Sequence, residues 1–484
     1  MKRARVVGSG PNGLSAAIAL AQAGVDVEVF EAETVPGGGA RTLPLTLPGF
    51  MHDFGSAVHP TAAGSPFFQT LPLADNGLEW IHGDFPLAHP LDDGTAVVLH
   101  RDLAAQDREF GVDAKAWRSL LQPIVDNWEL FAQEALGPVL RVPRHPLLMA
   151  RFGIAAFQPA RRVAMRHFKS PRTRALFAGL AAHSFLSLDD VLTTSVALVL
   201  AAAAHRVGWP IPRGGSQAIT QALIHIFESL GGKLYTGRRV DAEAFREWNV
   251  PEVLTLFDTS TQQLVGIAGD CLTPGFRELM LRFKRAPGAF KIDYALSHPV
   301  PWRARECRHA ISVHVGGTLE EIAESERLVS EGHHPERPFV LVAQPSIFDD
   351  TRAVPGKHTL WAYCHVPNGS TTDMTDRIEA QIERFAPGFR DCIMTRYVST
   401  PAILERMDAN LIGGDISGGA MTMKQLLLRP SALTYETSAA NLFLCSSSTP
   451  PGAGVHGMCG YRAAKIALQR SGLRQPGPAP PHVI

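Results

Sequence analysis

The 484-residue chain lacks several patterns that would assign it to a common functional class. Its six cysteines form no C-x-x-C pair, which argues against a redox disulfide and against a zinc ribbon. Neither an H-E-x-x-H motif nor a G-x-S-x-G elbow occurs, so neither a zinc protease nor a serine hydrolase is indicated. We therefore expect no metal site. Scattered single cysteines fit a reducing compartment, and we expect a cytoplasmic protein.

An excess of charge and long apolar runs are also absent. Lys+Arg and Asp+Glu number 46 each, and no basic block stands out, so nucleic acid is not an expected partner. The balanced charge offers no electrostatic anchor, and any membrane contact is expected to be peripheral. The most apolar stretch, VALVLAAAA at 196–204, is too short to span a bilayer. We expect a buried helix there; a surface that faces lipid or an oily substrate is the alternative.

What is present begins at the N-terminus, with a strand, a glycine-rich turn, a helix, a second strand and an acid. An apolar strand at 3–7 leads into G-x-G-x-x-G at 8–13, a helical run at 14–23, a strand at 25–30 and then Glu31. In such a unit the glycines allow a tight turn, close approach of a pyrophosphate, and close packing of helix on strand. The helix N-terminus attracts the phosphates, and the acid can bond ribose hydroxyls. This order predicts a dinucleotide-binding site.

A second glycine cluster follows at once and bears on which dinucleotide binds. Gly37, Gly38 and Gly39 stand two residues before Arg41. A nicotinamide cofactor does not need this cluster, whereas a larger dinucleotide lying extended along the protein would use both features. Glycines let the backbone approach closely, and an arginine offers a charged fork to phosphate. A surface loop is the alternative.

Four segments of the chain resemble the FAD-dependent phytoene desaturase-like family of flavoprotein oxidoreductases, within the wider group that includes amine oxidases. The segments are VVGSGPNGLSAAIALAQAG with VEVFEAE, GGGARTLPLTLPGFMHDFGSAVHP, PRGGSQAITQALIHIFESLGGKLYTGRRV, and NLFLCSSSTPPGAGVHGMCGYRAAKIAL. They follow the family's order and bracket nearly the whole chain.

The resemblance implies noncovalently bound FAD. It places the pyrophosphate at the first glycine turn, the ribose at Glu31, the phosphate and ribityl side near Arg41, and the adenine near Val240. The pyrimidine end of the flavin is expected at the turn after Gly454. The implied cofactor-binding residues are Gly8, Ser9, Gly10, Pro11, Asn12, Gly13, Glu31, Ala32, Gly39, Ala40, Arg41, Val240, Gly454, Val455, His456 and Met458.

The fourth segment also has a chemical rationale of its own. A strand at 442–445 leads through Thr449-Pro450-Pro451 and a glycine turn into an expected helix at 455–469. A helix N-terminus favours negative charge, and reduced flavin develops such charge near N1 and O2. Carotenoid desaturases typically carry a histidine before the Pro-Gly of this segment, whereas this chain has its histidine later, at His456. The departure leaves FAD binding intact and weakens the case for a carotenoid substrate.

These segments together predict an α/β fold with a Rossmann-type FAD-binding domain and a discontinuous α+β substrate domain, as in amine oxidases and phytoene desaturases. Alternating residues at 290–296 and 359–366 predict strands of a sheet that forms the floor of a cavity between the domains. Helices are expected at 260–268 and 375–385. The expected domain boundaries are 1–75, 205–245 and 436–484 for the FAD-binding domain, and 76–204 and 246–435 for the substrate domain.

Two histidines are candidate catalytic residues. His59 follows the second glycine segment, which runs toward the flavin in this family; a purely structural role is the alternative. His456 is expected beside the flavin ring. Tyr363 and His365 share one side of a predicted strand, and the pattern leaves open whether that side faces the cavity. Hydride transfer from a C–H bond to flavin N5 requires orientation and a dry cavity, so a base is not obligatory.

The residues and the resemblance thus predict an FAD-dependent oxidoreductase of the dehydrogenase or desaturase type. It would pass a hydride from an apolar or extended small molecule to flavin N5. A saturase or isomerase of the same family is one alternative. A protein that holds FAD without catalysis is another, against which the intact turn at 454–457 argues. The pattern leaves the substrate, the electron acceptor and the oligomeric state open.

Overall fold

A parallel sheet of five short strands positions the first glycine turn. The computed structural model describes residues 3–473, and the proline-rich tail from Gln475 lies outside the described residues. The strand order is β9-β2-β1-β10-β16, and all four pairings are parallel. Ligands of such sheets bind beyond the carboxyl ends of the strands. The strands are β1 Arg3–Val7, β2 Asp26–Phe30, β9 Lys233–Tyr235, β10 Val253–Phe257 and β16 Leu442–Leu444.

Helices cover both faces of this sheet, because successive strand residues point to opposite sides. Val6 and Leu256 belong to the core that includes the first helix, whereas Val7 and Phe257 pack in a second core on the other face. On the first face α1 (Pro11–Gln22) contacts both α10 (Gln217–Ser229) and α19 (Met458–Arg470). The second face holds α11 Ala242–Trp248, α12 Thr261–Ala268 and α13 Pro274–Leu281.

Strand β10 corrects one domain boundary. The sequence analysis assigned 246–435 to the substrate domain, but residues 253–257 of that stretch pair with β1 and β16 in the parallel sheet. The segment VLTLF is buried at all five positions. A strand buried on both faces shows no period-two alternation, which is typical of parallel sheets covered by helices.

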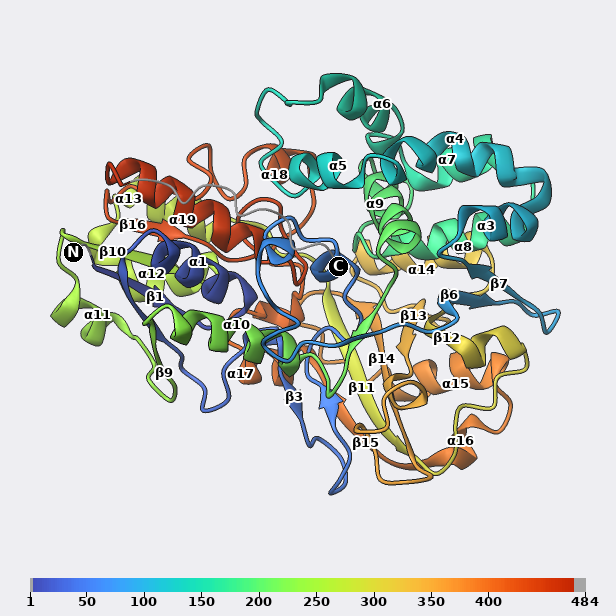
Figure 1. The fold of residues 1–484 in the computed structure, drawn as a ribbon. Coiled ribbons are helices and arrows are strands. Elements are labelled where there is room, and N and C mark those ends of the chain that lie inside the picture. The colour runs from blue at the N-terminus through green and yellow to red at the C-terminus, as the bar shows by residue number, and fades with distance from the viewer. Residues whose placement is uncertain (1–2, 474–484) are drawn as a thin grey trace.

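A second, mixed sheet of seven strands lies beside the first, in the order β15-β11-β14-β13-β12-β6-β7 (Figure 1). The strands expected at 290–296 and 359–366 are confirmed as β11 and β14, which pair antiparallel with Phe290 opposite Cys364. The strands are β6 Phe85–Pro90, β7 Ala96–Leu99, β11 Gly288–Leu296, β12 Ala310–Val315, β13 Val340–Ala343, β14 His358–Val366 and β15 Ile393–Ser399.

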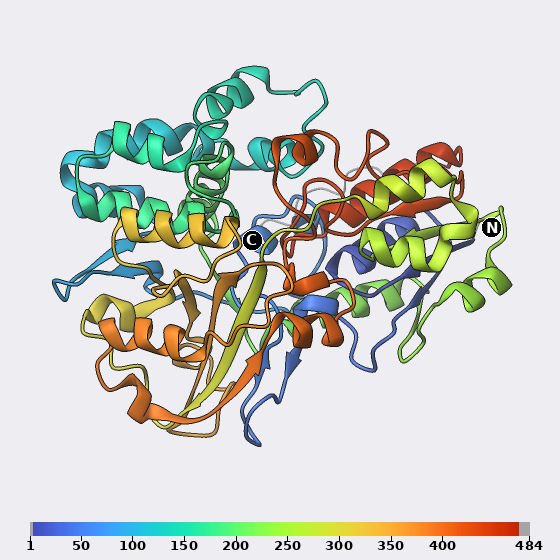
Figure 2. The same ribbon diagram turned by 180° about the vertical axis from the view of Figure 1, so that it is seen from behind.

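A layer of helices stands over one end of the second sheet (Figures 1 and 2). Helix α8 packs between α9 and α14 and also contacts β7. These helices are α3 Leu103–Phe110, α4 Ala114–Val125, α5 Trp128–Ala135, α6 Pro146–Ala156, α7 Ala160–His167, α8 Pro171–Ala182, α9 Thr193–Arg206 and α14 Leu319–Ser330. No helix within residues 3–473 is both long and apolar enough to cross a membrane.

Short elements connect these layers. The expected helix at 375–385 is confirmed, and the one at 260–268 begins at Thr261 with Ser260 as its N-cap. The remaining short elements are the 3₁₀ turn Gly38–Ala40, β3 Thr42–Leu43, β4 His52–Asp53, α2 Pro60–Ala63, β5 Trp80–Ile81, β8 Ile211–Pro212, α15 Thr375–Phe385, α16 Phe389–Cys392, α17 Pro401–Met407 and α18 Met423–Leu427.

The last helix begins later than the sequence predicts. The expected start was residue 455, whereas α19 begins at Met458. Gly457 before it has φ 66°, in the left-handed region, so the chain leaves the helical path there. Residues 452–457 therefore form a turn, and the helix N-terminus is set back from Gly454.

Candidate active site

A cavity of about 850 Å³ begins at the carboxyl ends of the parallel strands and extends to the helical layer. Its first part is lined by the glycine turn after β1, the end of β2 and the 3₁₀ turn Gly38–Ala40. Its middle is lined by β11, β14 and the loop before α19, and its far part by α6 and α9. The cavity thus joins the segments singled out by motif to an apolar region that has no motif.

The glycine turn is so tightly packed that side chains are excluded from it. A Cβ atom on Gly13 would lie 2.2 Å from the carbonyl oxygen of Gly8, and one on Gly10 would lie 2.7 Å from Oδ2 of Asp258. Gly8 itself has φ 99°. Gly8 and Gly10 line the cavity together with Pro11 and Asn12, whereas Ser9 and Gly13 shape the turn from behind.

Glu31 fixes the end of β2 against this turn. Its Oε2 accepts hydrogen bonds from the Ser9 backbone N–H at 2.9 Å and the Ser9 hydroxyl at 2.7 Å. Its Oε1 accepts one from the Glu33 backbone N–H at 2.9 Å. Glu31 is buried and also lines the cavity, as does Ala32. The carboxylate is thus held rigidly, with its remaining lone pairs available to a ligand.

Asp258, at the end of β10, is a site residue that the sequence analysis missed. It lines the cavity, and its Oδ2 accepts a hydrogen bond from the Gly13 backbone N–H at 2.8 Å. Burial raises the pKa of this carboxyl to about 7, although the bond from Gly13 opposes the rise. The sequence did contain a signal for this residue, because an acid directly follows the apolar segment VLTLF. The signal was overlooked because that segment was assigned to the substrate domain.

Arg41 is less free than a phosphate-binding arginine would be. Its Nε donates to the Gly38 carbonyl at 2.8 Å and its Nη2 to the Met407 carbonyl at 2.7 Å. The guanidinium also lies over the ring of Phe54, 4.7 Å from its centroid. Arg41 lines the cavity and holds the 3₁₀ turn against α17. The other residues expected near it or near the adenine also line the cavity: Gly39, Ala40 and Val240.

The residues expected at the flavin ring divide into two groups. Gly454 and Val455 line the cavity, whereas His456 and Met458 are not among its lining residues. His456 is fully buried, and its Nδ1 accepts a hydrogen bond from the Met458 backbone N–H at 3.1 Å. Burial lowers the pKa of His456 to about 4. The late start of α19 explains this placement, because the His456 ring caps the helix from within.

His59 lines the cavity and has a defined hydrogen-bond state. The Ser216 hydroxyl donates to the Ser56 carbonyl at 2.6 Å, so at 2.7 Å it must accept from the Nε2–H of His59. The Nδ1 atom then carries a lone pair, and it is buried with no partner within residues 3–473. Burial lowers the pKa of His59 to about 4, so the ring is neutral at neutral pH.

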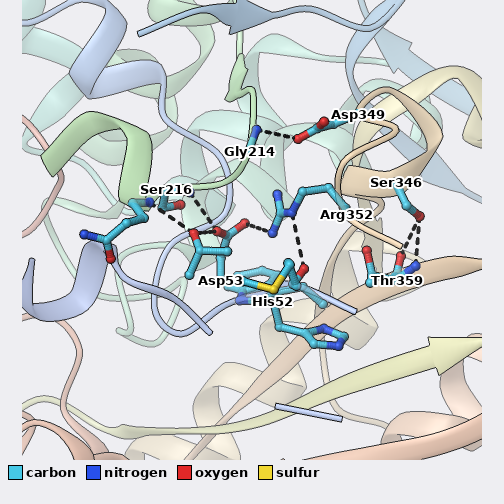
Figure 3. A network of polar contacts seen from close by, with 12 residues as sticks. His52, Asp53, Gly214, Ser216, Ser346, Asp349, Arg352 and Thr359 are labelled. Carbon is cyan, nitrogen blue, oxygen red and sulfur yellow. Dashed lines mark hydrogen bonds and ion pairs between the residues drawn. The ribbon is translucent and has the colours of Figure 1, made fainter. Parts of the chain in front are cut away.

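A buried polar network behind the cavity positions His59 and the second glycine segment (Figure 3). Asp53 Oδ1 accepts hydrogen bonds from the Thr42 hydroxyl and the Ser216 backbone N–H, both at 2.8 Å. Its Oδ2 accepts one from Arg352 Nη2 at 2.8 Å. Burial alone would raise the pKa of Asp53, but Arg352 and the hydrogen bonds outweigh it and the pKa lies below its usual value. One carboxylate thus joins β3, β4, the start of α10 and the loop that carries Arg352.

Replacement of Asp53 by alanine is expected to lower the free energy of unfolding by about 3–5 kcal/mol, because it leaves the buried Arg352 without its partner. Urea unfolding followed by circular dichroism measures this change. The matched control is Asp189→Ala, which breaks the exposed pair with Arg161 and should cost about 0–1 kcal/mol. Equal losses in the two variants would show that the Asp53 network does not support the site.

Polar side chains on the floor of the cavity come from β11 and β14. Lys291 lines the cavity, pairs with Asp293 and lies 5.9 Å from the Trp361 ring centroid. Burial lowers the pKa of Lys291, and the neighbouring Asp293 opposes this shift. The sequence analysis missed Lys291, although a charged residue inside the apolar strand FKIDYAL was a visible signal. Tyr363 also lines the cavity.

His365 shares the side of β14 on which Tyr363 lies but is not among the residues that line the cavity. The ring centroids of Phe185 and His365 lie 3.9 Å apart. The Nδ1 atom of His365 is 2.6 Å from Oε2 of Glu326. The side chain is 2% exposed. The Phe185 ring therefore separates His365 from the cavity, and this histidine is not part of the site.

The far part of the cavity is apolar. Val196, Val199 and Leu200 of α9 line it, together with Met149 and Phe152 of α6. The opposite face of α9 is buried, including the run of alanines at 201–204. The predicted buried helix is therefore confirmed for one face, and the other face lines the cavity.

Comparisons with known proteins agree with this architecture. A family model described as "NAD(P)-binding Rossmann-like domain" matches residues 6–71. The mouse protein "Pyridine nucleotide-disulfide oxidoreductase domain-containing protein 2" is 24% identical, over 96% of this chain and 93% of its own length. The lycopene-forming phytoene desaturase of Pantoea ananas is 25% identical, over 98% of this chain and all of its own length.

Solved structures show the same fold. An oxidoreductase from Methanosarcina mazei superposes with a TM-score of 0.64 at 16% identity, covering 96% of this chain and 100% of that chain. A putrescine oxidase bound to putrescine superposes with a TM-score of 0.60 at 16% identity, covering 97% and 99%. The predicted Rossmann-type, amine oxidase-like fold is thereby confirmed. The chain resembles phytoene desaturases along nearly its whole length, and it is an oxidoreductase.

Proposed function

We propose that the chain is an FAD-dependent dehydrogenase of the desaturase type, which passes a hydride from an apolar or extended small molecule to flavin N5. The observation that carries this proposal is the continuity of the cavity. It joins the glycine turn and Glu31 to an apolar part formed by α6 and α9. A cofactor that spans the first and middle parts would present its reactive end to a substrate in the far part.

The residues present fit FAD as the cofactor. The glycine turn is free of side chains because a Cβ on Gly8, Gly10 or Gly13 would clash with the protein, so its backbone is open to a pyrophosphate, and Glu31 is held at its edge. The cavity continues past Arg41 to the turn at Gly454. The adenosine half of a dinucleotide alone would need a shorter site. When bound, the flavin would supply a two-electron acceptor at N5.

The cofactor-binding residues proposed on this basis follow the cavity wall. Ser9 and Gly13 would act by shaping the turn, and His456 and Met458 by supporting the loop that carries Gly454. We keep the two-domain division, with 253–257 moved to the FAD-binding domain. The proposed cavity-lining contacts are Gly8, Gly10, Pro11, Asn12, Glu31, Ala32, Gly39, Ala40, Arg41, Val240, Gly454 and Val455.

The chain's own residues supply orientation, dryness and proton handling. The apolar side chains of α6 and α9 exclude water from the substrate part, which strengthens every electrostatic interaction there. His59 and Lys291 are two of the cavity-lining groups able to hold or pass a proton. His59 is neutral at neutral pH and offers a lone pair at Nδ1, so it can accept a proton released by the substrate. His456 is not among the lining residues, and we assign it no such part.

An anaerobic visible spectrum of the purified protein tests the proposal. Flavin bands are expected, and they should persist when NADPH or NADH is added but bleach with an oxidisable apolar substrate. Rapid bleaching by NADPH would overturn the dehydrogenase direction in favour of a reductase or saturase. If no flavin bands appear, even after reconstitution with FAD, the proposed cofactor is wrong.

A further inference from the structure

Helix α6 carries apolar residues on two opposite faces. Met149 and Phe152 line the cavity on one face. On the other face Leu147 is 86% exposed and Ile154 is 75% exposed. The segment before the helix adds Val142, which is 91% exposed. A helix that is apolar all round is normally buried, so an exposed one indicates a surface that something else covers.

Within the segment that contains α6, the charge is of one sign. Between Glu134 and Asp189 the chain has nine Lys and Arg residues and no Asp or Glu. The neutral total charge of the chain conceals this local asymmetry. Four of these arginines are exposed and form no ion pair with any residue of 3–473: Arg144, Arg151, Arg162 and Arg166.

This surface surrounds an opening of the cavity. Val139 and Phe157 both line the cavity and are 41% and 45% exposed, so they mark where it reaches the outside. They flank α6 on its two sides in the sequence. Figures 1 and 2 show α6 at the outer edge of the helical layer, beyond α9. The exposed apolar residues, the unpaired arginines and the opening therefore occupy one region.

We propose that residues 139–166, with α6 at their centre, dock on an anionic lipid bilayer and that apolar substrate passes from it into the cavity between Val139 and Phe157. We name this region the α6 surface. The exposed leucine, isoleucine and valine would enter the acyl boundary while the arginines meet the headgroup phosphates. The docking stands on the α6 surface alone, whereas the passage of substrate rests on the proposed function.

The charge distinguishes a bilayer from a second copy of this chain. A two-fold interface places the same patch on both partners. Two α6 surfaces facing each other would bring unpaired arginines together without acids of their own, which is unfavourable. An anionic lipid surface supplies the missing negative charge and an apolar phase together.

Co-sedimentation with lipid vesicles tests the proposal on the full-length flavin-loaded protein. Vesicles of phosphatidylcholine are compared with vesicles that also contain phosphatidylglycerol. The wild type should bind the anionic vesicles and release them at high salt. Arg144→Gln with Arg151→Gln should weaken binding to the anionic vesicles roughly twentyfold. Leu147→Asp with Ile154→Asp should abolish binding to the anionic vesicles.

The matched control is Leu279→Asp with Leu281→Asp on α13, where the side chains are 45% and 54% exposed outside the α6 surface. This variant should bind like the wild type. All variants should keep their flavin bands and melting temperature, so a failure of docking is separable from a failure of the proposed chemistry. The proposal is overturned if the wild type ignores anionic vesicles, or if the α6 and α13 variants behave alike. It is also overturned if the wild type is a dimer that the α6 substitutions convert to a monomer, while the vesicles bind no protein.

Discussion

Replacing Gly13 by alanine is expected to yield protein that purifies without flavin. The new Cβ would lie 2.2 Å from the Gly8 carbonyl oxygen, a backbone atom that cannot swing aside. The turn must then open, which displaces Gly8 and Gly10 from the cavity and disturbs the bond from the Gly13 N–H to Asp258. The flavin-to-protein ratio, from the visible spectrum and from FAD released on denaturation, measures the loss.

The control for this substitution is Gly266→Ala on α12, where a Cβ meets nothing within 4 Å. It should retain flavin and gain slightly in stability, as alanine does over glycine inside a helix. If Gly13→Ala does not fold, Glu31→Gln provides the test, because it keeps the shape but removes the charge at the cavity edge. Full flavin occupancy with unchanged FAD affinity in both site variants would show that the dinucleotide binds elsewhere.

Acid is expected to unfold this protein at about pH 5–6, well above the range in which carboxylates titrate. Burial, the largest cause in each case, lowers the pKa of seven histidines most strongly. These pKa values are about 3 for His52 and His183, about 4 for His59, His89, His205 and His456, and well below the usual value for His314.

The direction of this pH dependence follows from the linkage between folding and proton binding. The pKa of His314 shifts in the same direction as those of the other six. Each of those six histidines binds a proton near pH 6.5 when unfolded but only near pH 3–4 when folded. Its contribution is complete above pH 6.5 and is lost as the pH falls toward the folded value, at about 1.4 kcal/mol per pH unit. At pH 5 six such groups together cost roughly 12 kcal/mol. Burial raises the pKa of Asp258 to about 7 and that of Asp293 to about 6, which acts in the opposite direction and offsets about 3 kcal/mol. The remaining loss is comparable with the free energy of unfolding of a folded protein, which is roughly 5–15 kcal/mol.

Thermal unfolding measured from pH 8 to pH 5 by circular dichroism checks this expectation. His205→Gln should reduce the pH dependence by about 1.4 kcal/mol per pH unit, because it removes one buried ring that accepts a hydrogen bond from Trp117. His225→Gln, at an exposed position of α10, should leave the pH dependence unchanged. A melting temperature that is constant between pH 7 and pH 5 would contradict the prediction.

Local patterns account for the parts of the site that the sequence predicted. Gly13 is required because its Cβ would meet the backbone of neighbouring Gly8, whereas Gly8 and Gly10 are packed against the distant Asp258. The spacing of the three glycines is nevertheless recognisable within a few residues. Glu31 likewise follows directly from the strand that ends at the same sheet edge. The strands at 290–296 and 359–366 were visible because alternation reflects a property of each strand by itself.

Long-range packing accounts for the rest. Asp258 reaches the glycine turn only because β10 pairs with β1 across 250 residues of chain, and no local pattern announces that pairing. Lys291 becomes a cavity residue because of the face its strand presents, and His456 leaves the cavity because Gly457 delays the helix. The charge of the α6 surface was readable in the sequence but acquired meaning only beside an exposed apolar helix.

The sequence by itself determined the dinucleotide turn, the order of the elements and the flavoprotein-like architecture, because steric and periodic requirements act over short distances. Only the tertiary structure decided which side chains share the cavity and which helix stands at its opening. Those facts depend on pairing, strand face and burial, which are set jointly by residues hundreds of positions apart.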